Sequence, residues 1–386
     1  MRIAFYAPLK PPGHAIPSGD RHMGRLLMAA LEKAGHTVEV ASALRAFCRS
    51  PDHGCQAARA HEAQQETARL LAAYEAGDPA PDLWFTYHVY YKAPDWIGPA
   101  VSGAVGIPYV IAEASHAPKR AHGPWSAGHE AAGRAIAAAD VVVNLTRADR
   151  ICVEPAARPG AMADLPPFLD AAPFAAAFEG RGQARAALAA QAGLDPEIPW
   201  LLSVAMMRPG PKLESYRVLA QALSSLSAVP WRLVVVGEGE MRATVEAEFA
   251  AQGDRIAWLG EQPPAALPAL YAACDIYAWP AIHEAYGMAL LEAQATGLPV
   301  VAANVRGVPD VVADGETGCL TEEGDGAAFA GALAALLGDP AKRARMGTAA
   351  RAKVARRHGL DGASRQLDAI LIDAGRRHGA PRAATG

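Results

Sequence analysis

The chain has 386 residues and a formal net charge of −4 at neutral pH, with 36 basic and 40 acidic residues. This length exceeds what one hydrophobic core usually organises, so we expect two α/β domains of about 200 residues each. The balanced charge leaves no electrostatic footprint for nucleic acid, and the absence of a long basic run disfavours tight adhesion to anionic lipid.

The N-terminal half alternates short apolar runs with helical patterns, which is typical of a doubly wound domain. The predicted strands cover residues 2–7, 37–41, 82–88, 108–112 and 141–145, and the first helix covers residues 21–34. A loop rich in proline and glycine precedes this helix, and its Gly19 would let the backbone approach a ligand closely. His88 and His116 end two of the strands, where a lone histidine usually has a structural hydrogen bond.

Aromatic residues gather between residues 84 and 96. Stacking against a sugar and ordinary packing under a long loop are both consistent with this cluster, and the sequence does not separate them.

The cysteines are odd in number and follow no secreted disulfide pattern, which favours a reducing compartment. They are Cys48, Cys55, Cys152, Cys274 and Cys319. The first two lie near His53 and His61, but their irregular spacing favours a surface loop over a zinc site. The first apolar run, residues 3–9, is too short for a secretory signal or a membrane span, so we expect a cytoplasmic protein.

The most informative segment lies in the C-terminal half, where a short apolar strand at residues 275–280 precedes a loop and an apolar helix at residues 287–295. Glu284 lies in the loop, and the backbone amides from Tyr286 to Ala289 suit a phosphate at the helix start. Glu292 has apolar neighbours, and a buried carboxylate needs partners such as the two hydroxyls of a ribose. The alternative is a solvated helix face with two unrelated acids, which the apolar context disfavours.

The segment from residue 256 to residue 320 resembles the donor-binding core of the retaining glycosyltransferase family 4, which has the GT-B fold. The resemblance rests on Glu284 and Glu292, on residues 233–239 upstream, and on residues 306–318 downstream. It implies an α/β protein of two Rossmann-like doubly wound parallel-sheet domains that face each other across a cleft.

The resemblance also implies a domain plan and a set of site residues. Residues 1–170 would bind the acceptor, residues 171–357 would bind the nucleotide-sugar donor, and residues 358–386 would form a helix returning to the first domain and a tail. The implied catalytic residues are Arg208 and Lys212 on the donor pyrophosphate, Glu284 on the transferred sugar, and His116 near the donor sugar or acceptor. The implied donor-binding residues are Gly19, Gly237, Tyr286, Gly287, Met288, Ala289 and Glu292, the last on the ribose.

By the same resemblance, the implied function is retaining transfer of a hexosyl unit from a nucleoside diphosphate sugar, most commonly a UDP-sugar, to a hydroxyl acceptor. No Asp-x-Asp triplet is present, so we expect catalysis without a metal ion or other cofactor. The alternatives are an epimerase or phosphorylase of the same fold, and a nucleotide-sugar sensor without activity. Double displacement through an enzyme carboxylate is the alternative mechanism.

Four cations close to residue 358, namely Arg351, Lys353, Arg356 and Arg357, are interpreted as a solvated helix face in preference to a membrane-facing patch. The sequence leaves open the acceptor, the nucleotide and sugar, the linkage formed, and the oligomeric state.

Overall fold

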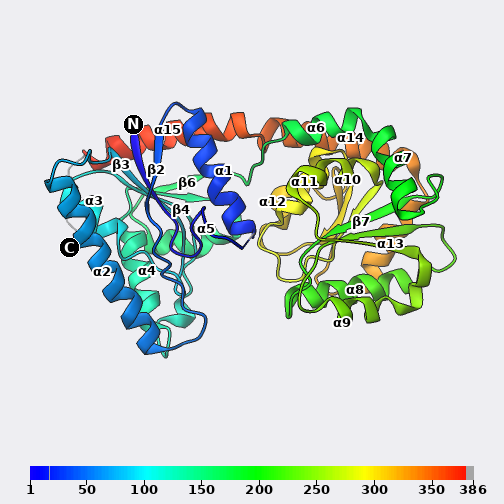
Figure 1. Ribbon diagram of the computed structural model, residues 1–386, viewed down its shortest axis with the longest axis horizontal. Helices are drawn as coiled ribbons and strands as arrows, with labels where there is room; N and C mark the ends of the chain where they lie inside the picture. Colours follow the sequence, from blue (N-terminus) through cyan, green and yellow to red (C-terminus); the bar gives the residue numbers. More distant parts are fainter. Residues whose placement is uncertain (17, 380–386) are drawn as a thin grey trace. The chain divides into compact units, whose positions relative to one another are not determined.

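The computed structural model describes residues 1–16 and 18–379 (Figure 1). The chain divides into two compact units, one made of Met1–Pro166 with the C-terminal segment from Leu360, the other of Pro167–Gly359. Each unit contains one six-stranded sheet, and all strand pairs are parallel. The predicted α/β class with two doubly wound parallel sheets is therefore confirmed. Among the described residues, no helix is both long and apolar enough to cross a membrane.

The strands of the first unit follow the order β2-β1-β3-β4-β5-β6. They are β1 (Arg2–Tyr6), β2 (Thr37–Ser42), β3 (Leu83–Val89), β4 (Tyr109–Ala114), β5 (Val141–Asn144) and β6 (Met162–Asp164). The central strands are apolar and buried on both faces, as parallel strands covered by helices must be. The order reverses between β1 and β3, so the loops after these two strands leave the same edge of the sheet on diverging paths.

The helices of the first unit are α1 (Gly19–Lys33), α2 (His53–Glu75), α3 (Gly98–Val105), α4 (Ser126–Ala138), α5 (Arg147–Val153) and α15 (Leu360–His378). Two short 3₁₀ segments, Pro118–Arg120 and Glu154–Ala156, complete this unit. Helix α1 begins at Ser18, whose side chain accepts a hydrogen bond from the Arg21 N–H at 3.2 Å. Helix α15 packs against α1, as Figure 1 shows, so the C-terminal segment closes the first unit.

Helix α2 corrects the prediction of a surface loop after the second strand. Within it Gln56, Ala63 and Leu70 are buried, a stripe that recurs only every seventh residue and is too narrow to give an apolar helical pattern. Cys48 and Cys55 form a disulfide with a Cα–Cα distance of 6.2 Å, and Asp52 caps the helix between them. The cysteine pattern favoured a reducing compartment, and this disulfide removes that support.

The strands of the second unit follow the order β12-β11-β10-β7-β8-β9. They are β7 (Trp200–Val204), β8 (Arg232–Val236), β9 (Ile256–Gly260), β10 (Ile276–Ala278), β11 (Val300–Ala303) and β12 (Gly318–Thr321). In chain order this is the strand order of dinucleotide-binding Rossmann domains, and it reverses between β7 and β10.

The helices of the second unit cover both faces of its sheet (Figure 1). They are α6 (Ala172–Glu179), α7 (Arg181–Ala192), α8 (Pro211–Ser224), α9 (Arg242–Glu248), α10 (Leu267–Ala273), α11 (Met288–Ala295), α12 (Val308–Val311), α13 (Gly326–Leu337) and α14 (Pro340–Arg357). The 3₁₀ segments are Ala250–Arg255 and Pro264–Ala266. Helices α8 and α13 pack together, whereas α10 packs against α7 and α11 packs against α14.

Candidate functional site

The candidate site of the second unit lies where its strand order reverses, outside the carboxyl ends of β7 and β10. Ligands of open α/β sheets bind at such points because the two loops diverge and leave a crevice. Lys212 lies in the first turn of α8, which follows β7, and Glu284 lies in the loop after β10. The Lys212 Nζ is 2.6 Å from the Glu284 Oε2. The fold therefore pairs two of the predicted catalytic residues directly.

The Lys212–Glu284 pair remains partly accessible, with side-chain exposures of 35% and 19%. The indole of Trp279 borders it on one side: its centroid is 5.2 Å from the Lys212 Nζ, and its Nε1 is 3.4 Å from the Glu284 Oε2. A lysine ammonium carries three N–H donors, and Glu284 uses one. The remaining donors are able to meet a second anion without breaking the pair.

The loop that carries Glu284 is held in a strained conformation. Ala281 and His283 have φ values of 58° and 51°, in the left-handed region that residues with a Cβ seldom adopt. The Ser215 Oγ accepts a hydrogen bond from the Ile282 N–H at 3.0 Å, and Glu323 accepts one from the His283 N–H at 2.6 Å. Such conformations persist when the surroundings impose them, and here those contacts fix the position of Glu284.

The N-terminus of α11 is the third component of the site. Gly287 begins the helix with φ 76°, and a Cβ there would lie 2.9 Å from the Leu290 side chain. The N–H groups of Met288 and Ala289 belong to the first turn and have no acceptor within the helix. With the helix dipole they form a partial positive charge suited to phosphate. Tyr286 precedes them and is buried.

Glu292 lies one turn further along α11, where Tyr271 of α10 donates a hydrogen bond from its Oη to the Glu292 Oε2 at 2.8 Å. Burial raises the pKa of Glu292, and the Tyr271 hydrogen bond opposes that shift. The sequence predicted a carboxylate in need of a partner but missed this one, because α10 and α11 meet only through packing. The other oxygen, Oε1, has no protein partner in the part of the chain that the structure describes.

Arg208 and Gly237 lie in the loops after β7 and β8. Arg208 is exposed and makes no side-chain hydrogen bond or ion pair with any described residue, so its charge is available to a ligand. Gly237 has φ 144°, and a Cβ there would lie 1.9 Å from the carbonyl oxygen of Ala205. The close approach of the two loops, with the Met207 N–H donating to the Glu238 carbonyl at 2.9 Å, requires this glycine.

The first unit has an ion pair at its own point of strand reversal. Asp20 lies next to Gly19 at the start of α1, and His88 lies near the end of β3. The Asp20 Oδ1 is 3.0 Å from the His88 Nδ1. Glu113 at the end of β4 lies 3.5 Å from the same nitrogen. Burial lowers the pKa of His88, but the carboxylates of Glu113 and Asp20 outweigh burial and raise it to about 9. A Cβ at Gly19 would meet nothing within 4 Å, so no contact inside the protein requires glycine there.

His116 follows β4 and lies against His129 of α4, with ring centroids 4.4 Å apart. Burial lowers the pKa of His116, and the neighbouring His129 lowers it further. The structure therefore places His116 in a histidine pair with His129, whereas Asp20 and Glu113 contact His88.

Cations lie over the aromatic rings of the first unit, and the sequence did not predict them. Arg120 lies 5.3 Å from the Tyr91 centroid, and Lys92 lies 5.4 Å from the Trp125 centroid. Tyr91 and Trp125 meet edge to face at 5.3 Å. Only the concentration of aromatic residues was visible beforehand, because Trp125 and Arg120 come from a loop about 30 residues further along the chain.

The zinc alternative near Cys48 and His61 finds no support, because Cys48 is bonded to Cys55 and the described residues contain no group of three metal-ligating side chains. Two of the four cations interpreted as a solvated face also lie elsewhere. The Lys353 Nζ is buried and donates to the Val311 carbonyl at 2.6 Å, and the Arg351 guanidinium stacks on Phe178. The prediction for these two residues was therefore wrong.

Comparisons with known proteins bear on the family and the fold of the chain. Residues 196–353 match the family described as Glycosyl transferases group 1. A D-inositol 3-phosphate glycosyltransferase from Acidothermus cellulolyticus is 30% identical over 313 residues, which cover 76% of this chain and 67% of that protein. The protein of the same name from Nocardia farcinica is 37% identical over 182 residues, covering 44% of this chain and 40% of that one. The protein of this name from Corynebacterium efficiens is 52% identical over 24% of this chain and 22% of that protein. The chain thus spans less than half the length of the Nocardia and Corynebacterium relatives that it matches.

Two solved structures share the fold at low identity. Sucrose-phosphate synthase from Thermosynechococcus elongatus superposes with a TM-score of 0.74 at 19% identity, covering 96% of this chain and 98% of that one. Anabaena HepE in complex with UDP superposes with a TM-score of 0.69 at 20% identity, covering 96% and 100%. The fold is the α/β two-domain GT-B fold of glycosyltransferases. The chain belongs to the Glycosyl transferases group 1 family and is GT4-like, as the motifs around Glu284 and Glu292 implied.

Proposed function

We propose that the protein is a retaining glycosyltransferase that moves a hexosyl unit from a nucleoside diphosphate sugar to a hydroxyl acceptor. One observation carries this proposal: Lys212 and Glu284 pair at 2.6 Å at the strand reversal of the second sheet, directly before the N-terminus of α11. A cation, a carboxylate and free helix amides at one point match the phosphates and the hydroxyl-rich sugar of such a donor.

The donor would be distributed over three parts of this site. The diphosphate would contact Arg208, Lys212 and the amides of Met288 and Ala289, which together supply two charges and two directed donors. The ribose hydroxyls would donate to Glu292, whose Oε1 has no protein partner among the described residues. Glu284, held by Lys212, would accept hydrogen bonds from hydroxyls of the transferred sugar.

The chemical step would break the bond between the anomeric carbon and the phosphate oxygen, which keeps the electron pair. The acceptor hydroxyl oxygen would bond to that carbon on the same face and pass its proton to the leaving phosphate. Lys212 would stabilise the charge that develops on the phosphate. Removing one such donor lowers turnover about 10²–10³-fold. The two cations and the helix N-terminus supply this stabilisation without a metal ion.

The donor nucleotide and the compartment are part of the proposal. Anabaena HepE was solved with UDP, which supports a UDP-sugar as donor here. The D-inositol 3-phosphate glycosyltransferases support a small hydroxylated acceptor. We propose a cytoplasmic location, where sugar nucleotides are made.

The proposal is tested by Lys212→Ala in the full chain. We expect donor hydrolysis or transfer to fall about 10²–10³-fold in kcat, with a smaller change in UDP affinity because Arg208 and the helix amides remain. Lys342→Ala on α14 is the matched control and should leave kcat unchanged. Activity should survive EDTA, and NMR should show retention at the anomeric carbon.

Three outcomes would contradict the proposal. If Lys212→Ala turns over like the wild type, the assigned site is wrong. A stable glycosyl adduct on Glu284, detected by mass spectrometry, would replace the single displacement with a double one. UDP binding without turnover across a panel of acceptors would instead indicate a sensor.

A further inference from the structure

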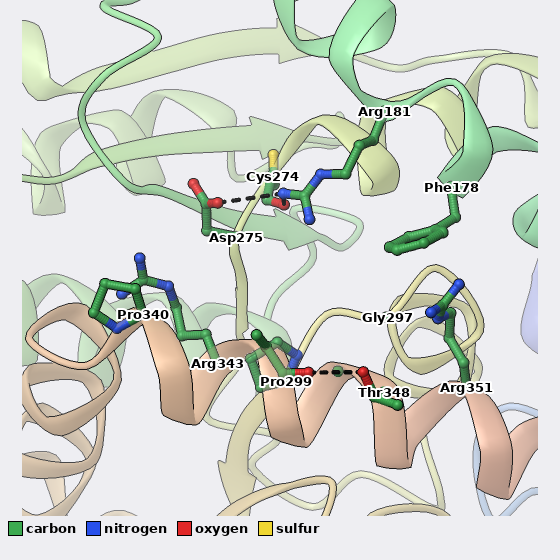
Figure 2. A pocket seen from close by; sticks show the side chains of 12 residues that line it. Phe178, Arg181, Cys274, Asp275, Gly297, Pro299, Pro340, Arg343, Thr348 and Arg351 are labelled. Atoms are coloured by element: carbon green, nitrogen blue, oxygen red, sulfur yellow. Dashed lines mark hydrogen bonds and ion pairs between the residues drawn. The ribbon is translucent and has the colours of Figure 1, made fainter.

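A second candidate binding site lies in the second unit, at the amino ends of the strands. Lys212 and Glu284 lie at the opposite, carboxyl ends. We call it the α14 pocket and define it by Phe178, Arg181, Asp275, Arg343, Thr348 and Arg351 (Figure 2). Its volume is about 250 Å³. Asp275 directly precedes β10, whereas Glu284 follows it, so the strand separates the two sites. The pocket is therefore no extension of the donor site.

The pocket is basic, since three arginines and a single acid line it. That acid, Asp275, is already engaged: Arg185 donates to it at 2.9 Å, and the Trp200 N–H donates to it at 2.8 Å. Arg181 reaches the same carboxylate at 3.4 Å, as Figure 2 shows. Arg343 bonds the Leu336 carbonyl, a neutral partner that leaves its charge uncompensated. The lining therefore has positive charge in excess.

Arg351 is the residue that points to a ligand. Its guanidinium carbon lies 3.5 Å from the centroid of the Phe178 ring, and Figure 2 shows the two groups face to face. Its Nε is buried without a hydrogen-bond partner, and the side chain makes no ion pair with any described residue. A stacked guanidinium keeps its N–H groups free at its edge, in the fork that suits phosphate oxygens. A buried donor without an acceptor costs free energy, which a phosphate here would recover.

The other lining groups and the volume narrow the class of ligand. The Thr348 hydroxyl donates to the Ala344 carbonyl at 3.0 Å, so its oxygen remains free to accept a hydrogen bond from a ligand hydroxyl. Pockets for drug-sized ligands have volumes of about 300–1,000 Å³, so a pocket of about 250 Å³ is too small for a nucleotide sugar. A phosphate group with a short hydroxylated body fits both the charge and the size.

We infer that the α14 pocket binds a small phosphate ester of a polyol or sugar, independently of the donor site. Arg351 and Arg181 hold the phosphate, and Thr348 accepts a hydroxyl. This site adds a second ligand to the proposed glycosyltransferase and does not depend on its chemistry. The pocket also includes Gly297, just beyond the C-terminus of α11, so its ligand lies against the helix whose other end faces the donor site.

The test is isothermal titration calorimetry of the full chain at low salt with a hexose 6-phosphate, inorganic phosphate and the free hexose as probes. We expect the ester to bind most tightly, inorganic phosphate more weakly, and the hexose not at all. Arg351→Gln should weaken ester binding at least about 10-fold, since a hydrogen bond to a charged group is lost. Arg356→Gln, an exposed arginine on the same helix, should stay within about 2-fold of the wild type.

Titration with UDP separates this inference from the proposed function. Arg351→Gln should retain the UDP affinity of the wild type and lose the ester, whereas Lys212→Ala should retain the ester. Arg181→Gln provides a second variant if Arg351→Gln does not fold. The inference is overturned if no ester binds up to about 10 mM, if inorganic phosphate binds and the ester does not, or if UDP displaces the ester.

Discussion

Replacing Glu292 by glutamine tests the donor assignment through the residue whose environment is most unusual. Burial raises the pKa of this carboxyl group, so the protein holds its ionised form at a cost. A group whose pKa is raised by folding contributes stability at low pH that is lost as the pH rises through the folded pKa. In the wild-type protein the Tyr271 Oη donates to the Glu292 Oε2 at 2.8 Å. Glutamine does not titrate, and its carbonyl oxygen can still accept this hydrogen bond. We therefore expect Glu292→Gln to be at least as stable as the wild type near neutral pH.

The same substitution should weaken donor binding. In the proposed complex both carboxylate oxygens accept hydrogen bonds, Oε2 from Tyr271 and Oε1 from the ribose. Glutamine places either an amide N–H₂ or a neutral oxygen opposite the ribose, so the charge-assisted hydrogen bond is lost. Such a bond contributes about 1.5–3 kcal/mol, which corresponds to roughly a 10- to 150-fold higher Kd for UDP.

Calorimetric titration with UDP measures the affinity, and differential scanning fluorimetry measures the Tm of the same samples. Glu197→Gln is the matched control, because Glu197 is exposed and precedes β7, at the edge of the sheet opposite the donor site. The control should change neither quantity.

An unchanged UDP affinity in a folded Glu292→Gln protein would refute the ribose assignment. A lower Tm with a proportionate loss of affinity would show that Glu292 supports the α10–α11 packing and does not contact the nucleotide.

Further predictions concern two glycines and a histidine. Gly237→Ala should lower the Tm by roughly 5 °C or more, because its Cβ would lie 1.9 Å from the Ala205 carbonyl oxygen. Gly19→Ala, with nothing within 4 Å, should change the Tm by no more than about 2 °C, and a raised donor KM would then assign Gly19 to the ligand. Burial lowers the pKa of His358 from 6.5 to about 4, and its contact with the Pro167 carbonyl opposes this shift. Because the unfolded chain binds the proton more tightly, the free energy of unfolding decreases as the pH falls from 6.5 to about 4. In urea titrations His358→Gln should reduce that loss by up to about 3 kcal/mol, and a wild-type slope would contradict the shift.

Local sequence patterns determined much of the fold. Apolar runs of strand length, such as residues 233–236, identify buried parallel strands because both faces of such strands are covered. The helix starting at Gly287 could be placed to within one residue from its glycine and its apolar run. Helix α2 was missed because its buried stripe is narrow, although its many alanine, glutamine and glutamate residues have high helix propensity.

The sequence by itself determined which residues could form the donor site: Glu284 and Glu292 have a recognisable spacing, and Lys212 follows a strand. Only the tertiary structure decided which groups meet. Lys212 and Glu284 are 72 residues apart, and they pair because β7 and β10 are neighbours at the strand reversal. Tyr271 and Glu292 likewise meet only because α10 and α11 pack together, and Arg351 of α14 meets Phe178 of α6 only in the folded chain. Local propensity sets the elements, whereas contacts between side chains depend on how those elements pack, and no spacing within one element encodes that.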